Sequence, residues 1–286
     1  MGDKSLKCDI CGKDSWGSED TINIMLPDTI RCAEHDRETV KHWKINGYYH
    51  EIINGECSDA MGEMLHPVVG QMAGVFHLIY ADMMYDNFDF SWLRLCRHLL
   101  NLHGSIFVQT DYRSVAELKL YMDDLFGKDN FINWIVWPYD WGGRPKNAFG
   151  RKHDDILWYS KTSLYRFYPE HVQIAKRTAG TSLNKSGRLT KTPTDVWSDI
   201  GNFHTMSSER ISDVRWQKPE RLIQRIVEAV TVEGDYVLDP FVGSGTTMAV
   251  CMKTNRNSLG IEIDKDIYDK AVERLNDISV STERLP

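Results

Sequence analysis

Residues 236–264 hold the strongest chemical pattern in the chain, YVLDPFVGSGTTMAVCMKTNRNSLGIEID. An apolar strand runs into a turn with glycines at 243 and 245, an apolar helix follows, and a second strand ends in acids at 262 and 264. Glycines let the backbone approach a ligand closely, and an acid after the second strand can bind the hydroxyl pair of a ribose. The pattern therefore predicts a ribose-containing ligand here, against the alternative of a generic α/β crossover with a tight turn.

Residues 239–247 read DPFVGSGTT, which resembles motif I of the amino-methyltransferases that modify exocyclic nitrogens of DNA bases. The resemblance implies that the pocket holds S-adenosylmethionine and not a dinucleotide. The glycine turn would cradle the methionine end of this cofactor, Phe241 would pack on it and Glu262 would bind its ribose. The full set of residues implied for the cofactor is Asp239, Pro240, Phe241, Gly243, Ser244, Gly245, Thr246, Glu262 and Lys218.

A second motif, Asp82-Met83-Met84-Tyr85, follows an apolar strand. Family members of the adenine type have Asp-Pro-Pro-Tyr at this place, whereas cytosine-N4 members usually begin with Ser. Asp82 therefore favours adenine N6. By this resemblance the base is flipped into a pocket, where Asp82 and the carbonyl of Met83 accept the hydrogens of its amine and Tyr85 stacks on the ring.

The two methionines replace prolines that fix φ and hold the loop carbonyl in place. Three explanations compete. Other packing can hold the loop of a normal enzyme, flexible thioethers can reshape the pocket for another base or a larger donor, or activity can be lost while cofactor and DNA binding remain. An N4-cytosine methyltransferase, an altered-donor modification enzyme and a catalytically inactive DNA-binding or partner subunit thus stay open beside adenine methylation.

The catalytic motif precedes the cofactor motif, which resembles the beta-class order of these enzymes. The likeness covers most of residues 50–270, including NGECSDAM at 54–61, KHDDILWYSK at 152–161 and QKPE at 217–220. In the family the QKP element helps to wall the methionine end of the cofactor, which implies that role for Lys218. The segment from about 162 to 208 would supply sequence recognition.

Apolar and β-branched runs predict strands at 74–80, 104–109, 131–137 and 155–159, and apolar spacing predicts helices at 89–100, 115–126 and 220–230. Strands that alternate with helices predict an α/β fold with a doubly wound, mostly parallel sheet. The resemblance implies the seven-strand type of methyltransferase sheet, related to the Rossmann fold, over residues 46–286. Trp134 is expected in the core and Trp141 on the surface.

Residues 1–45 are expected to form a small zinc-binding module. Cys8-x-x-Cys11 and Cys32-x-x-His35 are two ligand pairs separated by a polar loop, and paired thiolate and imidazole ligands suit tetrahedral zinc. So polar a segment could scarcely fold by burial alone, and the metal would stabilise it. The alternative is a redox Cys-x-x-Cys with an unrelated cysteine and histidine.

The charge distribution predicts a DNA partner. The 286-residue chain has a net charge of −7, which alone argues against nucleic acid. Residues 141–200, however, carry 11 Lys and Arg against 5 Asp and Glu, and concentrated positive charge suits a phosphate backbone. The sequence has no long apolar run and no signal-peptide core, so a cytoplasmic protein without a membrane span is expected. A homodimer and a restriction–modification setting are further expectations.

Overall fold

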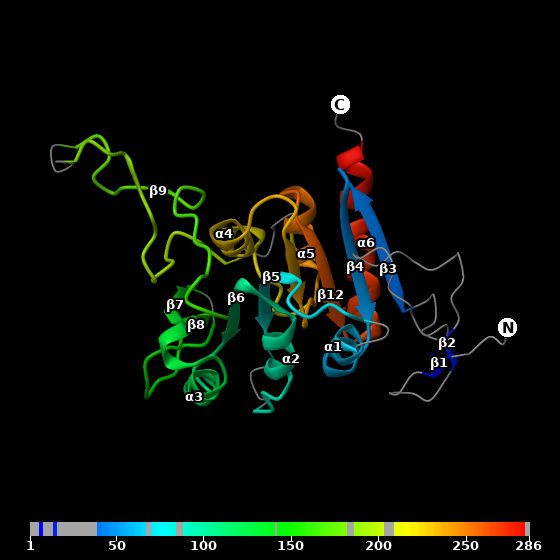
Figure 1. Cartoon of the computed structure of the whole chain (residues 1–286). Coiled ribbons are helices and arrows are strands. Elements are labelled where there is room, and N and C mark those ends of the chain that lie inside the picture. Colours follow the sequence, from blue (N-terminus) through cyan, green and yellow to red (C-terminus); the bar gives the residue numbers. More distant parts are fainter. Residues whose placement is uncertain are drawn as a thin grey trace.

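A sheet of eight strands spans the protein in the computed structural model, which describes residues 6–7, 14–15, 39–66, 70–83, 88–140, 142–181, 186–202 and 209–283 (Figure 1). The strand order is β3-β4-β12-β11-β5-β6-β8-β7. In chain order these strands are β3 (Val40–Ile45), β4 (Tyr48–Asn54), β5 (Phe76–Asp82), β6 (Leu100–Thr110), β7 (Phe131–Pro138), β8 (His153–Ser160), β11 (Tyr236–Asp239) and β12 (Asn257–Glu262).

Five neighbouring strands, β4, β12, β11, β5 and β6, run parallel to one another. β8 is antiparallel to β6, and β7 is antiparallel to β8, so β7 points the same way as the parallel strands. The prediction of a mostly parallel α/β sheet is confirmed. The described strands also include two short antiparallel pairs: β1 (Leu6–Lys7) with β2 (Asp14–Ser15), and β9 (Ile174–Ala175) with β10 (Thr190–Lys191).

The eighth strand is an addition at the edge. β3 pairs antiparallel with β4 over its whole length, and the indole of Trp43 donates to Asn276 Oδ1 at 2.9 Å. Residues 40–45 thus belong to the sheet, although the sequence placed them with the zinc module. The strand VKHWKI buries only its two ends fully, because an edge strand keeps one side open to solvent.

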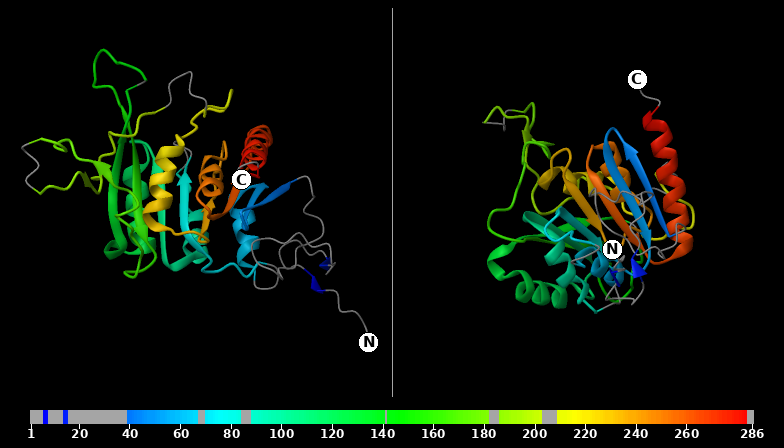
Figure 2. Two further views of the ribbon diagram at one scale, coloured as in Figure 1. Left: turned by 90° about the horizontal axis from the view of Figure 1, so that it is seen from above. Right: turned by 45° about the vertical axis from the view of Figure 1, so that its right-hand side comes forward.

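Helices cover both faces of the sheet (Figure 2). The helices are α1 (Cys57–Leu65), α2 (Trp92–Leu99), α3 (Val115–Phe126), α4 (Glu220–Val230), α5 (Thr246–Lys253) and α6 (Lys265–Glu283), with a short 3₁₀ turn at Lys128–Asn130. Ile79 and Ala81 of β5 pack with α1, α2 and α3, whereas Leu78 and Tyr80 of the same strand pack with α4 and α5. This alternation along one strand is what a sheet buried on both faces requires. No helix in the described part of the chain has the length and apolar character needed to cross a bilayer.

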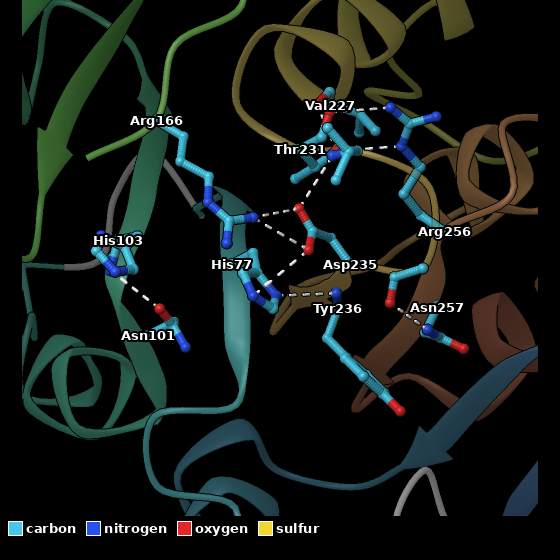
Figure 3. Close-up of polar contacts among 12 residues, drawn as sticks. His77, Asn101, His103, Arg166, Val227, Thr231, Asp235, Tyr236, Arg256 and Asn257 are labelled. Atoms are coloured by element: carbon cyan, nitrogen blue, oxygen red, sulfur yellow. Dashed lines mark hydrogen bonds and ion pairs between the residues drawn. The ribbon is translucent and has the colours of Figure 1, made fainter. Parts of the chain in front are cut away.

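The segment after β8 is fastened to the amino-terminal edge of the sheet (Figure 3). Arg166 Nη1 donates to both oxygens of Asp235, at 3.1 and 3.3 Å. Asp235 also lies 3.4 Å from His77 Nε2, and the backbone N–H of Tyr236 donates to His77 Nδ1 at 3.3 Å. Beyond this anchor, the segment that carries β9 and β10 extends away from the sheet (Figure 1).

Trp134 is a correction to the sequence prediction. Its side chain is 38% exposed, and its indole N–H donates to Asp155 Oδ1 at 2.7 Å. β7 is the edge strand of the sheet, so Trp134 has a neighbouring strand on one side only and is only partly enclosed. Trp141 lies outside the described residues.

Candidate active site

Asp239 shapes the turn that follows β11. Its carboxylate accepts hydrogen bonds from the backbone N–H of Phe241 at 3.0 Å and from Thr247 Oγ1 at 2.5 Å. Asp239 and Pro240 are both buried, and burial raises the pKa of Asp239 to about 7 against the opposing effect of its two hydrogen bonds. Both oxygens are therefore engaged within the turn that they stabilise.

Both glycines of the turn have a left-handed backbone conformation, which glycine adopts more readily than other residues. Gly243 and Gly245 have φ of +51° and +74°, in the left-handed region that side chains disfavour. Gly243 donates its N–H to Glu262 Oε2 at 2.9 Å, and Glu262 Oε1 accepts from the N–H of Asp264 at 2.9 Å. The acid at the end of β12 thus faces the glycine turn, and burial raises its pKa.

Packing brings the turn close to β12. A Cβ atom on Gly260 would lie 2.8 Å from both Val242 Cγ2 and Met248 Sδ, so only glycine admits this contact. On the other side, the ring of Phe241 meets Trp92 edge-on, with 4.9 Å between centroids. Phe241 is partly buried, so part of the residue remains accessible next to the turn.

Asp82 ends β5, the strand next to β11. The pairing of Leu78 with Val237 and of Ile79 with Leu238 makes these strands parallel neighbours. Their carboxyl ends therefore lie at one edge of the sheet, where ligands of open α/β sheets bind. The structure places the two predicted half-sites, Asp82 and the turn after Asp239, side by side.

The Asp82 carboxylate has one paired and one unpaired oxygen. Oδ2 lies 2.9 Å from Lys218 Nζ, whereas Oδ1 is buried and has no hydrogen-bond partner among the described residues. Burial raises the pKa of Asp82 to about 6, and the Lys218 ammonium opposes that rise. A buried, unsatisfied acceptor is costly in a folded protein and points to an unseen partner.

The remainder of the catalytic tetrapeptide is only partly described. Met83 is 3% exposed within the core, and its backbone N–H donates to the carbonyl of Gln109 at 3.2 Å. A proline could not make this bond. Met84 and Tyr85 lie outside the described residues.

Lys218 is the centre of a polar network that sequence reasoning missed. Its Nζ lies 3.3 Å from Asp154 Oδ2 in addition to its contact with Asp82. Asp154 Oδ2 also accepts from Gln109 Nε2 at 2.9 Å, and Asp154 Oδ1 accepts from Tyr139 OH at 3.0 Å. Tyr80 OH donates to Gln109 Oε1 at 2.8 Å. The network fixes the lysine between two carboxylates, one of which is Asp82.

Lys218 also connects the two half-sites. Its carbonyl accepts from Thr246 Oγ1 at 3.3 Å, and Thr246 Oγ1 lies 3.0 Å from Ser244 Oγ. The backbone of the residue thus contacts the start of α5 behind the glycine turn, while its ammonium reaches Asp82. The sequence predicted the first of these neighbourhoods for Lys218 but not the second.

A cavity of about 530 Å³ opens beside this network. That volume is within the range of small-molecule sites in proteins. Lys218 and Asp154 form part of its wall, together with aromatic and cationic side chains. The lining includes Tyr112, Arg113, Trp137, Tyr139, Arg151, His153, Arg210 and Trp216.

The predicted zinc ligands Cys8, Cys11, Cys32 and His35 all lie outside the described residues. Within the described ranges, no group of three or more His, Cys, Asp or Glu side chains could hold a metal ion. Cys57, Cys96 and Cys251 are buried free thiols, as expected for ordinary core residues.

Comparison with known proteins defines the class. The DNA methylase family (N6_N4_Mtase) matches residues 80–273, which include Asp82, Lys218, the glycine turn and Glu262. The chain belongs to this family, in the beta class of DNA amino-methyltransferases.

Two curated relatives are similar to about two thirds of the chain. The Type II methyltransferase M.HpaI of Haemophilus parainfluenzae is 32% identical over 193 residues, which is 67% of this chain and 60% of that protein. The Type II methyltransferase M.BglII of Bacillus subtilis is 32% identical over 196 residues, which is 63% of this chain and 54% of that protein. The chain thus spans little more than half the length of these relatives.

Solved structures share the fold. The complex of M1.HpyAVI with SAM matches with a TM-score of 0.55 at 22% identity and covers 78% of this chain and 98% of its own. The cytosine-N4-specific PvuII DNA methyltransferase matches with a TM-score of 0.58 at 15% identity and covers 82% of this chain and 92% of its own. At these identities the likeness concerns the arrangement of strands and helices.

Proposed function

We propose that this chain transfers the methyl group of S-adenosylmethionine to the exocyclic amine of a flipped base in DNA, with adenine N6 as the favoured acceptor. One observation carries the proposal above the others. The partly buried Asp82 carboxylate has a buried, unpaired oxygen at the carboxyl end of β5, next to the glycine turn that follows β11. An acceptor for amine hydrogens thus stands beside a nucleoside-binding turn.

The residues of the turn fit the cofactor. Left-handed glycines at 243 and 245 place no side chain at those two positions of the turn, the partly buried ring of Phe241 offers a flat surface, and Glu262 brings a carboxylate to the end of β12. We infer that Glu262 accepts from the ribose hydroxyls. When bound, S-adenosylmethionine supplies an activated methyl group on a sulfonium. One solved structure of the same fold is a complex with SAM.

The acceptor base is assigned to the cavity beside Lys218. Its aromatic wall can stack on a planar ring, and its volume admits a nucleobase. Asp82 contacts Lys218 of the cavity wall, and its Oδ1 would accept a hydrogen of the amine and turn the nitrogen lone pair toward the methyl group. Such a fixed acceptor works by orientation and by stabilising the positive charge that develops on nitrogen.

Lys218 keeps Asp82 suited to this task. Burial raises the pKa of Asp82 to about 6, and the ammonium 2.9 Å away opposes a larger rise. At neutral pH the carboxylate therefore stays charged and accepts hydrogen bonds. Asp82 in place of a serine is the reason for favouring adenine over cytosine.

DNA as the substrate is supported by charge and by relatives. Residues 141–200 carry 11 Lys and Arg against 5 Asp and Glu, and two relatives are named Type II methyltransferases. We infer that the segment from about 162 to 208 reads the DNA sequence and that the protein acts in restriction–modification. We also propose that Cys8, Cys11, Cys32 and His35 bind a structural zinc ion.

The test is chemical analysis of the product. The protein is incubated with unmethylated DNA and isotope-labelled S-adenosylmethionine, and the DNA is digested to nucleosides that are identified by mass. Labelled N6-methyladenine is the expected result. Labelled N4-methylcytosine would correct the acceptor base, whereas absence of any labelled nucleoside would refute the function and favour an inactive DNA-binding subunit.

A further inference from the structure

Phe149 is the most exposed large apolar side chain of the described residues, at 97%. It lies near the end of the loop between β7 and β8, residues 139–152, which rises from the sheet in the left view of Figure 2. Exposure of a whole phenylalanine ring to water is unfavourable, so a partner that covered the ring would gain from its burial. At this exposure Phe149 does not pack against the rest of its loop, so the structure of the loop does not require a phenylalanine at this position.

The base of the loop is fixed, so that its tip is held away from the sheet. The N–H of Tyr139 donates to the carbonyl of Lys152 at 2.8 Å, which continues the β7–β8 ladder. Lys152 Nζ donates to the carbonyls of Asp140 and Gly142, at 3.1 and 2.9 Å. At the neck, a Cβ on Gly150 would lie 3.1 Å from the Gly143 carbonyl oxygen, so the two sides of the loop come close together there.

The loop stands at the same edge of the sheet as Asp82. β7 points in the direction of β5, so the carboxyl ends of both strands lie at one edge. The guanidinium of Arg151, two residues after Phe149, lies 4.1 Å over the ring of Tyr112. Both side chains line the cavity that is assigned above to the acceptor base. The foot of the loop therefore forms part of the wall of that cavity.

The charges around Phe149 indicate which kind of partner would cover it. The loop carries Arg144, Lys146, Arg151 and Lys152 against a single acid, Asp140. Four cations would repel a second copy of the same loop, but they suit the phosphates that flank a groove. Proteins that distort duplex DNA insert apolar side chains between base steps, and a flipped base leaves a gap of that kind.

We infer that Phe149 is a positioning residue that enters the duplex and occupies the space left by the flipped base, while Arg144 and Lys146 of the loop hold the neighbouring phosphates. This inference rests on the proposed function and deepens it. The residue contacts neither cofactor nor acceptor amine. Phe149 acts by stabilising the flipped state of the base. Its contribution to kcat/KM is therefore expected to disappear when the target base has no pairing partner in the opposite strand.

The test compares two duplexes that contain the methylated site, once that site is known from the products of the wild-type protein. In one the target base is paired, and in the other it faces an abasic position. Phe149→Ala is expected to lower kcat/KM on the paired duplex about 10- to 100-fold, the scale of unstacking a base. On the abasic duplex the loss is expected to stay within about threefold. Phe149→Trp keeps a large ring and is expected to retain activity on both.

Leu102→Ala is the matched control, because Leu102 is 60% exposed near the start of β6, at the opposite edge of the sheet. Its kinetics are expected to equal those of the wild type. A fluorescent 2-aminopurine at the target position gives a second readout that needs no turnover, and Phe149→Ala is expected to reduce its rise in fluorescence. Equal activity of Phe149→Ala and wild type on paired DNA, or an equal loss on both duplexes, would overturn the inference. If the wild type methylates no DNA, the proposed function fails and the inference falls with it.

Discussion

The ammonium of Lys218 lies 2.9 Å from Oδ2 of Asp82, and this contact joins the end of β5 to the residues that precede α4. The same ammonium lies 3.3 Å from Asp154 Oδ2. One lysine therefore compensates two carboxylates in the proposed acceptor site, the buried Asp154 and the partly buried Asp82. Ion pairs with so little solvent around them depend on both partners.

The pH dependence of methyl transfer tests this pairing. The pKa of Asp82 is about 6, and the proposed role requires the carboxylate, so kcat/KM is expected to fall as the pH drops below about 6. Lys218 lowers that pKa. Lys218→Gln removes the positive charge, and the acidic limb of the pH–rate profile is therefore expected to move to higher pH.

Lys253→Gln is the control for the charge change, because Lys253 pairs with Glu220 whereas Lys218 pairs with Asp82. Its acidic limb is expected to match that of the wild type. A Lys218→Gln profile with an unmoved limb would show that Lys218 does not set the protonation of Asp82.

Met83→Pro tests whether the unusual tetrapeptide is impaired. Proline would remove the hydrogen bond from the Met83 N–H to the Gln109 carbonyl, worth about 1 kcal/mol, and would leave a void where the thioether packs. The variant is expected to melt at a lower temperature and to gain no activity. Met83→Leu keeps the N–H and most of the volume and is expected to behave like the wild type. A large gain of kcat in Met83→Pro would mean that the native strand end is poorly held.

Glu262→Ala is expected to weaken binding of S-adenosylmethionine by about 10-fold or more, the scale of a hydrogen bond to a charged group. The substitution removes the proposed ribose contact and also the acceptor for the Gly243 N–H. Isothermal titration measures the change. Asp269→Asn on α6, where the acid pairs with Lys265 in solvent, is expected to leave affinity unchanged. Unaltered binding by Glu262→Ala would remove Glu262 from the cofactor site.

Metal analysis of the purified full chain tests the proposed zinc module. About one equivalent of zinc per chain is expected, with loss of metal in Cys11→Ser and in Cys32→Ser. Cys57→Ser changes a buried free thiol outside the ligand set and is expected to retain metal. A metal-free wild-type protein would favour the redox interpretation of the cysteine pair.

Local patterns predicted much of the fold. The strand that ends at Asp82 and the helices α3 and α4 lie where their apolar residues indicated, because a strand buried on both faces shows a continuous apolar run and a helix buried on one face shows helical spacing. Strand β3 escaped prediction, since a short edge strand with polar residues at 41, 42 and 44 resembles a loop. Helix α6 is absent from the predictions, although Tyr268, Ala271 and Leu275 recur at helical spacing and are buried.

The candidate site was likewise predicted only in part. The glycine turn and Glu262 lie within one crossover, where motif and spacing define them. The contacts of Lys218 with Asp82 and Asp154 depend on strand order in the sheet, which no local pattern contains. Asp154 was part of a recognisable run, KHDDILWYSK, but nothing in that run distinguishes it from its neighbour Asp155.

Asp82→Asn gives the most direct test of the central claim, that the Asp82 carboxylate orients an exocyclic amine for methyl transfer. Label transfer is measured in a single turnover, from preformed complexes of protein, labelled S-adenosylmethionine and DNA. The account predicts that the variant binds the cofactor as the wild type does but transfers label about 100- to 1,000-fold more slowly, the usual cost of losing one preorganised charge-stabilising group. Transfer to DNA at the wild-type rate by Asp82→Asn would contradict it.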